Sequence, residues 1–164
     1  MNDDLKLIDE LIRAHRGISQ RVRSLESSVT DLEAVLDLQK AQSGWELDSK
    51  EALAQKQAAL GETLGYLDAG LRRHFEYEEI KLPGLFSPLM MQWLKLEHAR
   101  ILEGIARAKE SLVVSEAELA HEQRLSRKWD IQRMTSEISR DVEDHARKEE
   151  VTYEMIKTAL TKTG

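Results

Sequence analysis

The sequence predicts an all-α protein, folded as an antiparallel four-helix bundle with up-down-up-down order. Hydrophobic residues make up 41% of the 164 positions and charged residues 33%, with 5% aromatic residues and 2 prolines. That balance is typical of helix-forming chains. Apolar residues recur at steps of three and four along four long segments, as on one face of a helix. Both prolines fall in the short stretch 82–88, which is the clearest turn signal in the chain.

The first helix is predicted over residues 3–40. Its apolar seam has one gap of seven residues, between Leu11 and Ile18, and His15 fills the middle of that gap. The stretch 42–45, with sequence QSGW, then breaks the helical pattern. Because His15 lies within the apolar stripe, it is predicted to face the core.

The second helix is predicted over residues 47–81, where a leucine seam continues into His74 and Glu78. The third is predicted to begin at Pro88, because proline is favoured at the first position of a helix. The fourth runs almost to the end of the chain. We place the poorly marked turn before it within residues 116–127. Since the connections are short, neighbouring helices should be antiparallel, and residues 1–164 should form a single domain.

Composition also limits the classes of partner. The net charge is -6, whereas a nucleic-acid-binding protein needs a basic face. No apolar run is long enough to cross a membrane, and no signal peptide is visible. The absence of cysteine excludes disulfides and thiolate ligands and is consistent with a reducing compartment. We expect a cytoplasmic protein that binds neither nucleic acid nor a membrane.

Four of the five histidines lie on the apolar seams of four different helices. His74 and His145 are each followed four residues later by a glutamate, which a helix places on the same face. In an up-down-up-down bundle all four regions meet at one end. Buried carboxylates cost several kcal/mol unless they are compensated, and two divalent cations would supply the charge. Imidazole with carboxylate suits iron, manganese or zinc. The predicted metal ligands are His15, His74, Glu78, His98, His145 and Glu149.

These ligands lie in the segments LIRAHRGI (11–18), LRRHFEYEEIKLPGLF (71–86), LKLEHARI (94–101) and DHARKEE (144–150). Through them the chain resembles the hemerythrin-like (HHE cation-binding) family over most of its length. The resemblance implies two iron ions joined by an oxo or hydroxo bridge. It also implies a small ligand, which would be oxygen, nitric oxide or peroxide.

The resemblance has one departure. Oxygen-carrying hemerythrins have a second histidine one turn away on the third helix, but Leu94 and Leu102 flank His98 here. The resulting set of four histidines and two glutamates is similar to the branch associated with repair of iron centres and with sensing of nitric oxide, oxygen or iron. A carrier, a sensor and a di-iron enzyme or iron donor in oxidative or nitrosative stress repair all stay open.

A second class of function is a metal-free helical bundle for interaction or phosphotransfer. Phosphotransfer domains display an exposed histidine, and His15 is followed by Arg16 and Gly17 in weak likeness to them. The position of His15 on the apolar seam argues against phosphorylation.

Several residues near the ligands receive separate predictions. Glu79 and Glu150 should face solvent or a neighbouring helix, and Glu97 should lie on the surface. Tyr153 is interpreted as a core or boundary tyrosine in preference to a group above the metals. Phe75 could either wall a gas site or simply pack in the core, and Trp93, Met90 and Met91 share these two interpretations. His121 should be exposed near the last turn. A further set of leucines could pack within one chain or form a homodimer: Leu32, Leu36, Leu60 and Leu112.

Overall fold

In the computed structural model the protein is all-helical over the residues that it describes, which are 3–41, 46–113 and 121–162. Side chains at 35–41, 46–50, 121, 122, 124 and 125 fall outside that description. The elements in chain order are α1 (Asp3–Ala41), α2 (Glu46–Lys81), the 3-10 helix η1 (Leu82–Gly84), α3 (Pro88–Leu112) and α4 (His121–Lys162). The predicted helix bounds are confirmed to within one residue for α1, α2 and the start of α3. Helix α4 begins inside the range predicted for the last turn.

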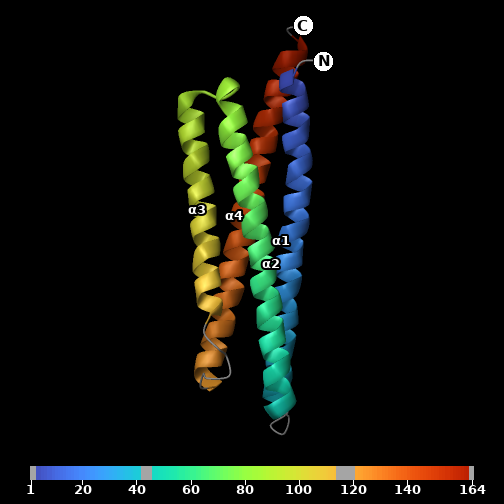
Figure 1. Ribbon diagram of the computed structural model, residues 1–164, viewed down its shortest axis with the longest axis vertical. Helices are drawn as coiled ribbons and strands as arrows, with labels where there is room; N and C mark the ends of the chain where they lie inside the picture. The colour runs from blue at the N-terminus through green and yellow to red at the C-terminus, as the bar shows by residue number, and fades with distance from the viewer. Residues whose placement is uncertain (1–2, 42–45, 114–120, 163–164) are drawn as a thin grey trace.

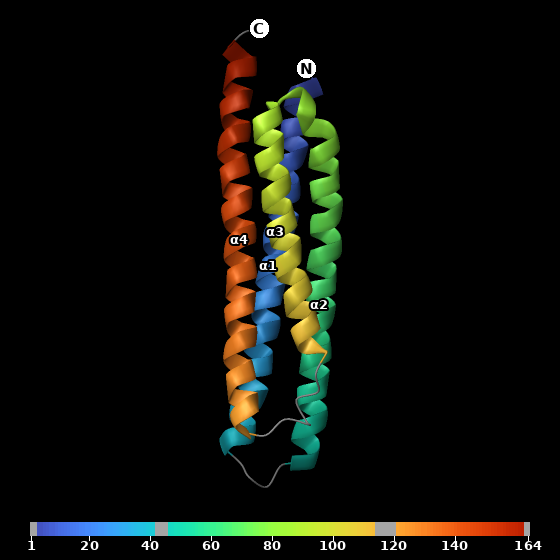
Figure 2. The same ribbon diagram turned by 90° about the vertical axis from the view of Figure 1, so that its left-hand side faces the viewer.

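The four helices form a bundle in which each packs against two others. Helix α1 contacts α2 and α4, and α3 likewise contacts α2 and α4. The two chain ends and the η1 connection lie at one end of the bundle (Figure 1), and the view turned by a right angle shows the four helices running along a common long axis (Figure 2). None of the described helices has a stretch apolar enough to cross a membrane.

The connection from α2 to α3 is tightly built. The backbone N–H groups of Leu85 and Phe86 both donate to the Leu82 carbonyl at 2.8 Å. The Ser87 hydroxyl then accepts a hydrogen bond from the Met90 N–H at 3.3 Å, so that it caps α3, with Pro88 at the first helical position. This short, capped turn sets the height of α3 relative to α2.

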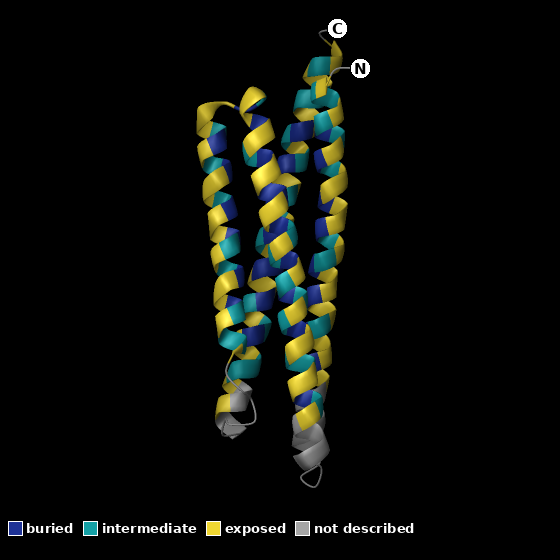
Figure 3. Ribbon diagram, in the orientation of Figure 1, coloured by how far each residue is buried: buried dark blue, intermediate teal, exposed yellow. Residues whose placement is uncertain are grey.

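Buried residues line the inward faces of the helices and exposed residues the outer faces (Figure 3). They form two apolar clusters. The larger one fills most of the bundle and includes Leu32 and Leu60, so these two leucines pack within the chain, while the side chain of Leu36 lies outside the described residues. The smaller cluster lies near the chain ends and comprises Ile8, Leu11, Leu82, Phe86, Met91, Leu94 and Tyr153. Between the two clusters lies a layer of polar side chains.

One contact between α1 and α2 depends on a glycine, Gly70, which has no side chain. The Arg21 guanidinium of α1 donates to the backbone carbonyl of Tyr66 at 3.0 Å. It lies where a Cβ at Gly70 would be, so any larger residue at that position would collide with it. The glycine therefore allows Arg21 to cross α2 closely.

We expect Gly70→Ala to stabilise the protein less than Gly65→Ala. Replacing a glycine inside a helix by alanine adds roughly 1 kcal/mol to the free energy of unfolding, and no atom lies within 4 Å of a Cβ added at Gly65. At Gly70 the displacement of Arg21 offsets this gain. Chemical denaturation measures both variants. In an Arg21→Ala background the two substitutions should stabilise equally, and a full gain for Gly70→Ala with Arg21 present would contradict the expectation.

Candidate metal centre

The six predicted ligand residues meet in the polar layer between the two apolar clusters. They form two groups that could hold a metal ion, and within each group the ligand atoms lie within 4.8 Å of one another. One group comprises His15, His74, Glu78 and Glu149, and the other comprises Glu78, His98, His145 and Glu149. All six side chains are buried. The convergence predicted from the sequence is therefore present, while binding of metal there stays a prediction.

The first group is centred on the histidines of α1 and α2, and we call it the α1/α2 half-site. His74 Nε2 lies 3.0 Å from Glu78 Oε1, and His15 Nε2 lies 3.7 Å from the same oxygen. His15 Nε2 also lies 3.2 Å from Glu149 Oε2. Glutamates from α2 and α4 thus complete a site begun by two histidines.

The second group, the α3/α4 half-site, mirrors the first. His98 Nε2 lies 3.4 Å from Glu78 Oε2, and His145 Nε2 lies 3.4 Å from Glu149 Oε2. Glu78 therefore turns one oxygen toward each half-site. Each half-site has its own pair of histidines, whereas both glutamates are shared between the two.

The inward atoms of this layer lack hydrogen bonds. The Nε2 atoms of all four histidines are buried without a hydrogen-bond partner despite the short distances, and so are Glu78 Oε2 and both carboxylate oxygens of Glu149. Buried polar atoms are nearly always satisfied in folded proteins. Among the described residues no lysine or arginine is buried. Imidazole nitrogens and carboxylate oxygens are the donor atoms that divalent transition metals accept, so the residues present fit a pair of metal ions.

The electrostatics of the metal-free layer show how strongly it favours positive charge. Burial alone would lower the pKa of His15, but contact with Glu149 and Glu78 outweighs burial and raises it to about 10. The pKa of His98 is raised in the same way. Burial and the charge of His98 together lower the pKa of His145 to about 4. A proton on His15 thus supplies positive charge to this layer, and a metal ion would have to displace it.

A second set of glutamates holds the outer nitrogens of three of these histidines. Glu150 Oε1 lies 3.2 Å from His15 Nδ1, Glu79 Oε1 lies 2.8 Å from His98 Nδ1, and Glu97 Oε2 lies 3.3 Å from His145 Nδ1. A carboxylate on Nδ1 keeps the proton there and turns the lone pair of Nε2 inward, which is the arrangement that orients metal-bound histidines. We call these three residues the outer glutamates.

The positions of the outer glutamates can be compared with those predicted for residues beside the ligands. Glu79 and Glu150 each face a neighbouring helix, which is one of the two places predicted for them. The surface position predicted for Glu97 is wrong, because its side chain is 13% exposed and lies against His145. Each outer glutamate is the immediate chain neighbour of a ligand. On a helix such a neighbour lies on the flank that meets the next helix, and this adjacency is the signal that could have identified all three.

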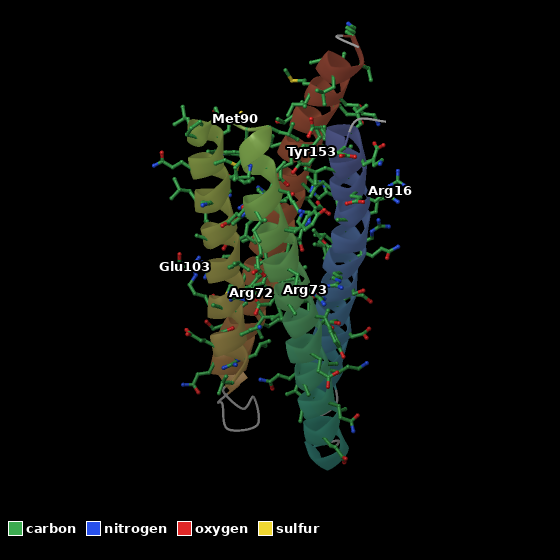
Figure 4. All side chains as sticks on the ribbon, turned by 45° about the horizontal axis from the view of Figure 1, so that its top comes forward. Arg16, Arg72, Arg73, Met90, Glu103 and Tyr153 are labelled. Atoms are coloured by element: carbon green, nitrogen blue, oxygen red, sulfur yellow. The ribbon has the colours of Figure 1, made fainter. Side chains whose placement is uncertain are left out.

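Tyr153 belongs to the smaller apolar cluster and also touches the site. Its hydroxyl donates a hydrogen bond to Glu78 Oε1 at 2.8 Å, and its ring stacks on His15 with centroids 6.0 Å apart. Figure 4 shows Tyr153 among the side chains between the helices, with Arg16 pointing away from the bundle. Interpreting Tyr153 as only a core or boundary residue is therefore incomplete. Burial raises the pKa of the Tyr153 phenol above its ordinary value, and the charges of Glu149 and Glu78 raise it further.

Aromatic rings also wall the α3/α4 half-site. Phe75 stacks on His98 with ring centroids 3.8 Å apart and meets His145 edge-on at 5.5 Å. Trp93 lies 6.3 Å from His145. Phe75 packs in the larger cluster and also lies against both histidines of this half-site, while the wall of a gas site stays a prediction. His121 is the first residue of α4, and its side chain lies outside the described residues.

Comparison of the chain with protein-family models, with curated proteins and with solved structures gives no match.

Tyr153→Phe is expected to lower the free energy of unfolding of the metal-free protein by roughly 1.5–3 kcal/mol, because a hydrogen bond to a charged acceptor is lost. The acceptor, Glu78, stays buried. Tyr66→Phe provides the matched control, since that ring is 70% exposed and such surface changes alter stability by about 0.5 kcal/mol or less. Thermal and urea unfolding followed by circular dichroism measure both. Equal stability of the two variants would contradict the assigned hydrogen bond.

Proposed function

We propose that this chain is a hemerythrin-like protein, an up-down-up-down antiparallel bundle that holds two iron ions between its helices. In this proposal it binds or senses oxygen, nitric oxide or a related small oxidant. The observation that carries the proposal is the convergence of unpaired, buried donor atoms from all four helices on one layer. The resemblance of the four ligand-bearing segments to the hemerythrin-like family supports iron as the metal.

The sharing of the glutamates supports two ions in preference to one. Each half-site offers two histidine nitrogens, and both draw on Glu78 and Glu149. A carboxylate that reaches two metals holds them close enough to act together. When bound, a pair of iron ions would supply reversible oxidation and an open position for a small ligand. The outer glutamates would orient three of the four histidines, and Tyr153 would hold Glu78 in place.

The surroundings favour a small ligand that needs little room. Phe75 and the two apolar clusters enclose the layer, and each ligand side chain is at most 8% exposed. Such a site excludes bulky substrates but admits a diatomic molecule or peroxide. Turnover of nitric oxide or peroxide, or release of iron for repair, would use the same residues and is distinguished by measuring turnover. A phosphotransfer role is not supported, because His15 is 1% exposed.

Anaerobic reconstitution with ferrous iron should load about two iron ions per chain, as expected of a two-metal site. Exposure to air should then give near-ultraviolet charge-transfer absorption that changes on adding nitric oxide.

His98→Leu should lower the iron content, because it removes one histidine from the α3/α4 half-site. Glu103→Gln, exposed on the same helix, should load like the parent. Elemental analysis and absorption spectra measure both effects.

A colourless protein that stays metal-free after this reconstitution would overturn the proposal. Loading with zinc or manganese in preference to iron would overturn the assignment of the metal while leaving the site itself intact.

Glu79→Gln should weaken iron binding by about 10- to 100-fold, the range typical for loss of a carboxylate that orients a metal-bound histidine. The amide can still fill the space but no longer holds the proton on His98 Nδ1 as a charged acceptor does. Competition with a coloured chelator measures the affinity. Glu76→Gln is the matched control, because Glu76 is exposed on the same helix, two positions from Glu78. Equal affinity of the two variants would contradict the role assigned to Glu79.

A further inference from the structure

A groove between α2 and α3 runs from the surface toward the site. Its volume is 670 Å³. The lining residues that matter here are Arg72, Phe75, Glu79, Lys95, His98 and Ala99. Arg72 lies on the surface of α2 at the rim (Figure 4), where its Nε donates to Asp68 at 2.9 Å. The rim carries charges of both signs, because Lys95 and Glu79 also border it, so it does not exclude a small neutral or anionic molecule.

The inner end of the groove is formed by the stacked rings of Phe75 and His98. Phe75 lines the groove and also stacks on His98, with an angle of 8° between the ring planes. The same ring meets His145 edge-on. Phe75 therefore lies between the groove and His145, beside the edge of His98 that borders the groove.

Approaches to the layer along the bundle axis, between α3 and α4, and between α1 and α4 are covered by packed side chains. Along the bundle axis the two apolar clusters lie on either side of it. On the side of α3 and α4, the Lys148 ammonium lies 3.3 Å from Glu97 and 5.8 Å from the centre of the Trp93 ring, so these groups cover His145. Between α1 and α4, Glu150 lies against His15. The groove between α2 and α3, by comparison, borders His98 directly, with Glu79 against its outer nitrogen.

We propose that the groove between α2 and α3 is the access route for the small ligand and that Phe75 is its inner gate. The ligand then arrives at the α3/α4 half-site rather than at the α1/α2 half-site, where Tyr153 stacks on His15. This inference rests on the proposed function. It makes Phe75 and Ala99 determinants of the rate at which a ligand enters, although neither side chain supplies a donor atom to the site.

A substitution that only narrows an access route changes the binding kinetics differently from a substitution in the binding site. Narrowing the groove raises the barrier between free and bound ligand without altering either end state. The association and dissociation rates must then fall by the same factor, and the dissociation constant must stay unchanged. A substitution that disturbs the site itself changes the dissociation constant instead.

The test uses azide as the small anionic probe on the iron-loaded, air-oxidised protein, with stopped-flow absorption as the readout. Ala99→Trp places a large ring in the groove. It should slow both rates roughly tenfold, the factor that about 1.4 kcal/mol of added barrier produces. Ala69→Trp adds the same ring on the exposed outer face of α2 and should leave both rates unchanged. Phe75→Leu should raise both rates, because the smaller side chain leaves the gate partly open.

The outcomes separate the two proposals. If iron and azide bind but the Ala99→Trp variant shows the same azide association and dissociation rates as the Ala69→Trp variant, the access route is overturned and the proposed function stands. A change confined to one of the two rates would also overturn the route, because it alters the bound state. A chain that takes up no iron overturns the proposed function and the route with it. Ala99 is exposed, so this variant tests the route even if Phe75→Leu does not fold.

Discussion

The structure depends on the burial of two carboxylates among four histidines, with no buried lysine or arginine in the described part of the chain to neutralise them. A carboxylate in an apolar interior is strongly destabilising when it is alone. For Glu78 the protein compensates in two ways, whereas burial raises the pKa of Glu149 above its ordinary value. The nearby imidazoles hold the pKa of Glu78 well below its ordinary value despite its burial, and the Tyr153 hydroxyl donates to one of its oxygens. Both compensations leave inward-facing atoms unpaired, which is why the layer is suited to a cation.

The rest of the fold serves to hold this layer at one height. Long apolar seams below it and a smaller cluster above it fix the helices against one another. The capped turn before α3 fixes the height of His98 relative to Glu78. Because both half-sites take their glutamates from α2 and α4, a shift of either of these helices by a turn would break both half-sites, whereas a shift of α1 or α3 would break one. The stability of the site is therefore inseparable from the packing of the whole bundle.

Much of this was predictable from the sequence, and the reasons differ between residues. The helix bounds follow from the apolar period and the two prolines, and the inward position of His15 follows from the gap that it fills. The i, i+4 spacing was enough to place Glu78 and Glu149 beside their histidines. The division of the six residues into half-sites was not predictable, because it depends on rotamers and on the rotation of each helix about its axis. Glu97 was misplaced for the same reason, since it lies at the boundary between solvent and the next helix.

The division of donors along the chain has a consequence for assembly. The η1 connection separates His15, His74 and Glu78 in the first half of the sequence from His98, His145 and Glu149 in the second. Each half therefore carries three of the six donors, and neither half can form a complete half-site, because each one needs a glutamate from the other. An ion that meets the nascent chain before its second half has docked finds an incomplete set of donors. In the proposed metal centre, selection of the metal would thus wait until the tertiary structure has formed.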